Sequence, residues 1–227
     1  MIVRPINVLL DPRNTFMSMA NRPTWVAPLT ILMLLATLTS TLTFDRLDVA
    51  QAVREQFAAQ GRTPDPVQID RGVTLFQNLR GVAALVTLVS FPLAMMLVAF
   101  VFWFAFQLAG REMDYGASVS VTMHSMMPWA VASLLSVPVI LSRDSITPRE
   151  AMSGDVLVSS LGFLAPSDAA PAWAALLSSV DLFSLWTAIL LVIGYRTAAK
   201  ASTVTACFVV SFVWLGYVSI KIGWLAL

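Results

Sequence analysis

The stretch GVAALVTLVSFPLAMMLVAFVFWFAFQLA, residues 81–109, contains no charged side chain over its whole length. An apolar block of about 18 or more residues is typical of a helix that crosses a membrane. In lipid such a segment must be helical, because backbone N–H and C=O groups left unpaired there cannot be hydrated. The stretch therefore predicts an all-α integral membrane protein.

Four further apolar blocks extend this prediction to a bundle of five transmembrane helices. The expected spans are 25–44, 81–109, 118–141, 172–195 and 201–227. The composition agrees, because 58% of the residues are hydrophobic, 12% are charged and the mean hydropathy is +0.78. A soluble domain carries about 25% charged residues. We expect an N-terminal segment, 1–24, followed by a transmembrane domain, 25–227.

The charge and the cysteine content exclude several function classes. A net charge of +1 provides no basic field for nucleic acid, so no nucleic-acid partner is expected. Cys207 is the one cysteine, and one thiol can build neither an internal disulfide nor a zinc or iron–sulfur site. We therefore expect no cofactor.

The segment before the first span predicts a short helix lying in the membrane interface. Asp11 suits an N-cap, Pro12 suits the first helical position, and Phe16 and Met19 follow at helical spacing. No cleavable signal peptide is evident, because the first apolar block follows a segment that contains arginines and prolines.

The first loop, residues 45–80, predicts an amphipathic helical hairpin on the membrane surface. Val49, Val53 and Phe57 recur at helical spacing before the breaker GRTPDP, residues 61–66. Thr63 or Asp65 can cap a second helix that runs into the second span.

The loop charges give an orientation. Lys and Arg divide almost evenly between the two sides, so the positive-inside rule does not decide. Acidic residues are more numerous on the side of the first loop. We therefore expect a cytoplasmic N-terminus and, with five spans, a C-terminus on the opposite side.

Asp181, at the front of DLFSLWTAILLVIGY (residues 181–195), is the one carboxylate expected inside an apolar block. A charged group in the bilayer is costly, so an intramembrane ionisable residue is a functional hypothesis by default. Three interpretations remain open. The carboxylate forms a salt bridge with Lys221, it caps the embedded helix together with nearby serines, or it handles a proton or ion.

The motif MHSMMPW, residues 123–129, predicts a kink in the third span. Pro128 frees the carbonyl of His124 beside Ser125. The kink opens a polar pocket or is an ordinary bend that neighbouring helices repair. His124 either bonds a nearby carbonyl or contacts a ligand.

The turn GYRTAAKAS, residues 194–202, places Arg196 and Lys200 where anionic lipid headgroups lie. Arg111, in the turn before the third span, is a third candidate headgroup contact.

Catalytic motifs are absent from the sequence, including G-x-S-x-G, the P-loop and H-E-x-x-H. Neighbours such as His124 and Ser125 point in different directions on a helix and do not form a nucleophile–base pair. We therefore expect a protein that is not an enzyme.

Three stretches resemble bacterial members of the Yip (Ypt/Rab-interacting protein) family. They are LLDPRNTFMSMANRPTWVAP (residues 9–28), AGREMDYGASVSVTMHSMMPWAV (109–131) and VDLFSLWTAILLVIGYRTAAKAS (180–202). The last is similar to the family's most recognisable stretch, with Asp181 and Trp186 early in the fourth span, Gly194 near its end and a basic turn after it.

The resemblance implies a five-helix bundle with a cytoplasmic N-terminus, in a bacterial cytoplasmic membrane and with a periplasmic C-terminus. Eukaryotic members shape membranes and engage small GTPases through an N-terminal region with an Asp-Leu-Tyr-Gly-Pro type motif. This chain has only residues 1–24 before the first span and lacks that motif, so small-GTPase binding is not expected.

Two functions fit these observations. The first is a non-catalytic membrane protein that organises partner proteins or lipids, with the lipid bilayer, other membrane proteins or a second copy of itself as partners. The second is a small transporter or channel whose polar groups line a path through kinked spans. A continuous polar track between the two sides would favour the second.

Overall fold

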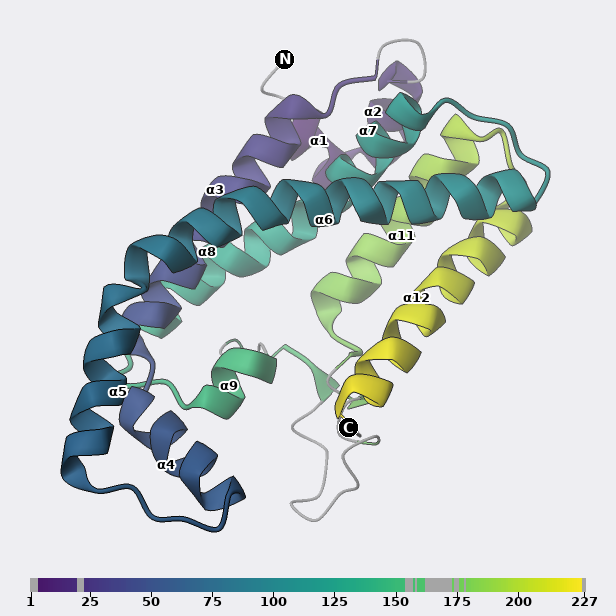
Figure 1. Cartoon of the computed structure of the whole chain (residues 1–227). Coiled ribbons are helices and arrows are strands. Elements are labelled where there is room, and N and C mark those ends of the chain that lie inside the picture. Colours follow the sequence, from purple (N-terminus) through teal and green to yellow (C-terminus); the bar gives the residue numbers. More distant parts are fainter. Residues whose placement is uncertain are drawn as a thin grey trace.

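The regular elements of the protein, seen in a computed structural model, are helices. The structure describes residues 4–19, 23–153, 157, 159–161, 173, 176–177 and 179–225. The helices are α1 Arg4–Leu10, α2 Pro12–Met19, α3 Val26–Arg46, α4 Val49–Ala59, α5 Pro66–Asn78, α6 Arg80–Leu108, α7 Tyr115–Ser125, α8 Met127–Leu141, α9 Pro148–Ser153, α11 Leu182–Ala198 and α12 Thr203–Leu225 (Figure 1).

Four helical segments of the described chain are long and apolar enough to cross a membrane: α3, α6, α7 with α8, and α12. They match the predicted first, second, third and fifth spans, although 226–227 lie outside the described residues. The prediction of a multi-pass all-α membrane protein is confirmed at this level.

The fourth predicted span, 172–195, begins later than expected. Its helix, α11, has 17 residues, which is about 25 Å of helix against a hydrocarbon core of about 30 Å. The backbone of Asp181 is extended, with φ −132° and ψ 165°, so the helix cannot continue back through this residue. Much of 172–178 lies outside the described residues.

The core lies at the end of the bundle that carries α1 and α2 (Figure 1). There α6 and α12 contribute their buried residues from the parts nearest the turns that join them to α7 and α11. Further along α6, toward α5, large apolar side chains such as Leu85, Val89 and Leu93 are exposed. In a membrane protein such side chains face lipid.

The predicted helix after Asp11 is present as α2, with Pro12 at its first position and Asp11 Oδ1 accepting from the Asn14 N–H at 3.4 Å. It packs against α11, and Phe16 and Met19 are buried in the main core. Its apolar face therefore points into the bundle. The preceding helix α1 was not predicted.

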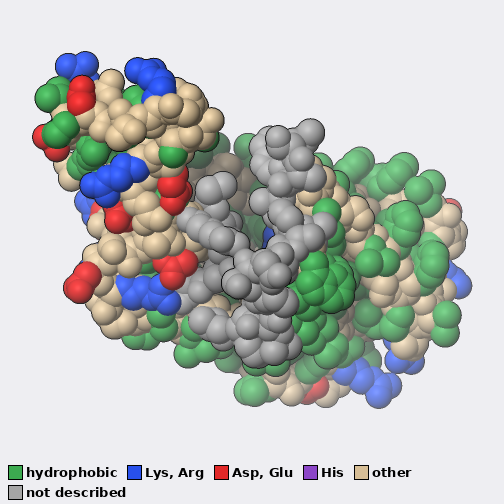
Figure 2. All heavy atoms as spheres, turned by 90° about the horizontal axis from the view of Figure 1, so that it is seen from below, with side chains coloured by type: hydrophobic (Ala, Val, Ile, Leu, Met, Phe, Trp, Pro, Cys, Tyr) green, Lys and Arg blue, Asp and Glu red, His purple; other side chains and the backbone are tan. Residues whose placement is uncertain are grey.

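The predicted hairpin is confirmed as α4 and α5. Asp65 caps α5, Pro66 stands at its first position, and Asp65 and Gln68 form a reciprocal capping box. The two helices approach closely at Gly72, where a Cβ would lie 2.6 Å from Val53 Cγ2. After α5, Leu79 joins it directly to α6. Figure 2 shows acidic and basic side chains gathered over this hairpin.

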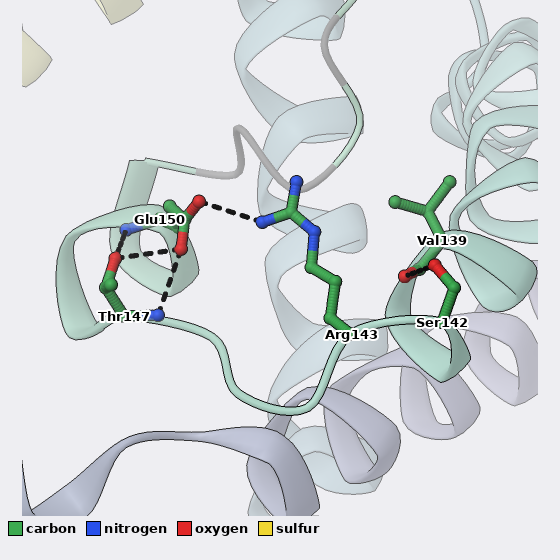
Figure 3. Close-up of polar contacts among 5 residues, drawn as sticks. All are labelled: Val139, Ser142, Arg143, Thr147 and Glu150. Carbon is green, nitrogen blue, oxygen red and sulfur yellow. Dashed lines mark hydrogen bonds and ion pairs between the residues drawn. The ribbon is translucent and has the colours of Figure 1, made fainter.

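A short segment after α8 ties the hairpin end of the bundle together. The Asp48 N–H donates to Ile146 O at 2.8 Å, and the Ile146 N–H donates to Arg46 O at 2.7 Å. The Arg46 guanidinium donates to the carbonyl of Arg143. Figure 3 shows the next link, in which Arg143 pairs with Glu150 at 2.8 Å. These contacts fix the end of α3 to the loop that leaves α8.

Candidate functional site

The third span is broken where the sequence predicted a kink. Met126 separates α7 from α8, and Pro128 has no N–H with which to bond the carbonyl of His124. The Trp129 N–H bonds instead to Met126 O at 3.0 Å, which is a tighter turn than that of an α-helix. The kink is therefore real.

His124 and Ser125 are both fully buried at this break. His124 Nδ1 lies 2.9 Å from the carbonyl oxygen of Ser120. A carbonyl only accepts, so Nδ1 carries a proton, and in the neutral ring Nε2 then carries a lone pair. Within the described part of the chain, His124 Nε2 and Ser125 Oγ have no hydrogen-bond partner. One ring nitrogen thus matches the carbonyl-bonded interpretation, while the other is open to a ligand or water.

A hydroxyl cluster around Tyr195 holds three helices together. Tyr195 Oη lies 2.7 Å from Ser118 Oγ and 2.9 Å from Thr122 Oγ1, and Ser118 Oγ is 2.7 Å from Ala99 O. The single proton of Ser118 goes to Ala99 O, so Tyr195 donates to Ser118 and Thr122 donates to Tyr195. The ring of Phe106 stacks on Tyr195 with centroids 4.6 Å apart. The cluster therefore links α6, α7 and α11.

The sequence did not identify the Tyr195 cluster. Tyr195 was interpreted as the end of a span, because its partners come from helices far away in the sequence. A signal was present, since Ser118, Thr122 and Ser125 follow one another at i, i+4 and i+7 and so share one face of a helix. A polar stripe on one face of a transmembrane helix indicates contact with another helix.

Gly194 lets α11 approach its neighbours at the same level. A Cβ there would lie 2.6 Å from Val121 Cγ1 of α7 and 3.0 Å from two ring carbons of Phe16 in α2. Small residues at helix contacts allow such close packing in membranes. Trp186, two turns earlier on α11, is partly buried and packs against the same core.

Asp181 caps α11. Its Oδ1 accepts from the N–H groups of Phe183 at 2.7 Å and Ser184 at 2.9 Å, and Ser184 Oγ in turn contacts the Asp181 N–H at 3.1 Å. This reciprocal capping box satisfies backbone groups at the start of the helix. The structure therefore shows the capping interpretation of this carboxylate.

The salt bridge expected between Asp181 and Lys221 is not formed. Lys221 Nζ instead donates to Ser179 Oγ at 3.2 Å, two residues before Asp181. Lys221 still links the end of α12 to the start of α11, so the tie between the two helices exists through a hydroxyl. The carboxylate is already occupied by N–H donors of its own helix, which removes its need for a distant cation.

The three candidate headgroup residues lie in two turns. Arg196 and Lys200 are exposed at the end of α11, and Arg111 is half-buried just after α6. Lys200 has φ 47°, the left-handed conformation that commonly ends a helix. Their contact with lipid headgroups stays a prediction.

The predicted site residues form two groups rather than one site. His124, Ser125 and Pro128 lie at the break between α7 and α8. Asp181 lies at the start of α11, and Lys221, near the end of α12, reaches Ser179 beside it. In the described residues, no group of three or more His, Cys, Asp or Glu side chains could hold a metal ion. The hydrogen bonds of these groups position helices, and they assemble no nucleophile with a base.

Comparison with known proteins is consistent with this architecture. The family model named Yip1 domain matches residues 6–225. Neither a curated protein nor a solved structure matches the chain. Yip1 domain proteins are generally non-catalytic membrane proteins, and the prediction that the chain is not an enzyme is confirmed. Because the match covers nearly its whole length, the chain belongs to the Yip1 domain family.

Proposed function

We propose that this protein organises partner proteins or lipids in a bacterial cytoplasmic membrane, with its N-terminus in the cytoplasm and its C-terminus in the periplasm. The observation that carries this proposal is the use of the embedded polar groups. Tyr195, Ser118 and Thr122 bond one another, and Asp181 bonds the N–H groups of its own helix. Groups used in this way stabilise a scaffold.

The hairpin α4–α5 supports the same proposal. No residue of either helix is fully buried, and the hairpin carries charges of both signs together with exposed apolar side chains such as Val67 and Leu75. A helical pair held by caps and exposed on most of its surface offers a face to another protein or to the membrane surface. The expected partners are other membrane proteins, a second copy of the chain or lipids.

Site-specific photo-crosslinking in native membranes tests the proposal. One probe replaces Leu75 of α5, whose side chain is 62% exposed, and a matched control probe replaces Phe208 of α12, which is 71% exposed. We expect discrete adducts at position 75, identified by mass spectrometry, and mixed bulk lipid at position 208. If position 75 yields no discrete protein and no enriched lipid, the organising role is wrong.

A small transporter or channel is the second candidate. It is favoured by buried side-chain atoms that have no hydrogen-bond partner among the described residues: Thr24 Oγ1, His124 Nε2, Ser125 Oγ and Thr187 Oγ1. Buried polar groups normally have partners, so these atoms can contact a polar solute or water. A flux that depends on His124 would establish this function.

A further inference from the structure

A groove runs along α3 between α6 and α8, which lie beside it in Figure 1. It has a volume of about 610 Å³, and its walls include Phe91 of α6 together with Met126 and Trp129 at the break between α7 and α8. The floor follows one face of α3 from Leu32 to Leu47. The volume lies within the range of about 300–1,000 Å³ that is typical of ligand pockets.

A second hollow, of about 550 Å³, continues the groove beyond the end of α3. The two share Phe44 and Leu47, and the charged residues that line the second are Asp45, Arg46, Asp48, Arg80 and Asp144. Asp48 caps α4, with Oδ1 accepting from the Gln51 N–H at 2.8 Å. Arg80 is bound by Asp45 through two hydrogen bonds of 2.6 Å. The Arg46 guanidinium donates one hydrogen bond to the Arg143 carbonyl, which leaves its other N–H groups for a phosphate. In the described part of the chain, Arg46 has no carboxylate partner and Asp144 has no partner of opposite charge.

The chemistry along this path changes in a fixed order. At the mouth lie a guanidinium and a carboxylate, Arg46 and Asp144. One turn deeper lies Thr43, and Ser133 of α8 also lines the groove. Thr39 and Ser40 line it as well, but their hydroxyls already contact Leu35 O at 3.0 Å and Thr87 Oγ1 at 3.3 Å. Deeper still the walls are apolar, with Leu32 at the end.

The length of the path matches one leaflet. From Arg46 to Leu32 are fourteen residues of helix, which is about 21 Å at about 1.5 Å per residue. A bilayer with its headgroups is about 40–45 Å thick, so half of it is about the same length. Charged, hydroxyl-bearing and apolar zones follow one another as do the headgroup, the ester region and the acyl chain of a phospholipid.

We propose that this groove binds one amine-headed glycerophospholipid, such as phosphatidylethanolamine, from the leaflet on the side of the α4–α5 hairpin. Arg46 binds the phosphate, because guanidinium and phosphate form strong charge-assisted hydrogen bonds. Asp144 receives the ammonium group. Thr43 and Ser133 donate to ester carbonyls, and an acyl chain fills the apolar part of the groove. The site deepens the proposed function and rests on it, since a lipid is one class of molecule that the protein would organise.

Native mass spectrometry of the full chain tests this site. The protein is reconstituted in bilayers of phosphatidylethanolamine and phosphatidylglycerol in equal amounts, extracted in mild detergent, and assayed for retained lipid. We expect one retained phosphatidylethanolamine. Arg46→Gln lowers its retention about tenfold or more, whereas Arg54→Gln, the same change at an exposed position of α4, leaves it unchanged. Asp144→Asn removes the preference over phosphatidylglycerol.

A second pair of variants blocks the groove without changing charge. Ala36→Phe fills the groove and abolishes retention, whereas Leu38→Phe, on the exposed side of α3, does not. The thermal unfolding midpoint of each variant confirms that it is folded. Absence of retained lipid in the wild type, equal retention of phosphatidylglycerol, or equal loss with Leu38→Phe would overturn the site. The crosslinks at position 75 are read independently, so a lipid-free groove with discrete protein adducts leaves the proposed function standing.

Discussion

The close contact at Gly194 predicts a large effect from one methyl group. In Gly194→Ala the new Cβ would lie 2.6 Å from Val121 Cγ1, and Val121 is a short, buried side chain on α7 that cannot swing aside. Phe16 closes the other side with two ring carbons at 3.0 Å. Helix α11 must therefore move away from α2 or α7. Overpacking of this kind lowers the free energy of unfolding by about 1–3 kcal/mol.

Gly216→Ala is the matched control. Gly216 lies in α12, and a Cβ there meets no atom within 4 Å. Alanine is favoured over glycine in a helix by about 0.5–1 kcal/mol, so this variant is expected to be slightly more stable than the wild type. The two variants make the same chemical change and are predicted to shift stability in opposite directions.

The assay is denaturant unfolding of the purified protein in detergent micelles, followed by circular dichroism. A double variant tests the cause, because Val121→Ala removes the atom that the new methyl group strikes. The loss from Gly194→Ala is then expected to be smaller in the Val121→Ala background than in the wild type. If Gly194→Ala is as stable as Gly216→Ala, or if its stability loss is the same in the Val121→Ala background as in the wild type, the reasoning about this contact is refuted.

Three further predictions concern polar groups. Tyr195→Phe removes the hydrogen bonds between the Tyr195 hydroxyl and Ser118 and Thr122, and it lowers the free energy of unfolding by about 1–2 kcal/mol in the same assay. Tyr217→Phe, at a position that is 59% exposed on α12, leaves the free energy of unfolding unchanged. Asp181→Ala removes the cap of α11 and lowers the free energy of unfolding by about 1 kcal/mol. Asp181→Asn keeps an accepting oxygen and is expected to lose less stability, so equal losses would refute the capping role. Hydrogen bonds from the Thr147 backbone and hydroxyl, and from Arg143, hold the pKa of Glu150 below its usual range. The stability that Glu150 contributes is therefore full above the pKa of the unfolded carboxyl, about 4.3, and is lost as the pH falls through the lower pKa of the folded state. Glu150→Gln is expected to flatten this part of a stability–pH profile. A profile that is unchanged by Glu150→Gln would contradict this prediction.

Helix ends that depend on neighbouring residues were predictable from the sequence. Asp65 and Pro66 mark the start of α5, and Pro128 marks the break between α7 and α8, because a cap or a missing N–H acts within one turn of helix. The hairpin and four of the spans follow from such local signals together with long apolar runs.

Features that depend on contacts across the bundle were not predictable. The start of α11 was placed too early, because hydropathy alone does not distinguish a capping Asp181 from one inside a helix. The partners of Tyr195 lie on α7, more than seventy residues away in the sequence. The pairing of Asp48 with Ile146 joins two loops without periodicity. Only the folded arrangement brings these groups together.

The central claim is that the polar groups inside the membrane stabilise the bundle and do not conduct. The most direct measurement is the flux of protons and small ions through proteoliposomes that contain the wild type, His124→Gln or Tyr195→Phe, with folded protein matched between samples. The account predicts that the flux through all three proteins equals that of protein-free liposomes, while Tyr195→Phe unfolds at a lower denaturant concentration than the wild type. If the wild type gives a flux above that of protein-free liposomes, and His124→Gln abolishes this flux, the account is contradicted and a transport function is established.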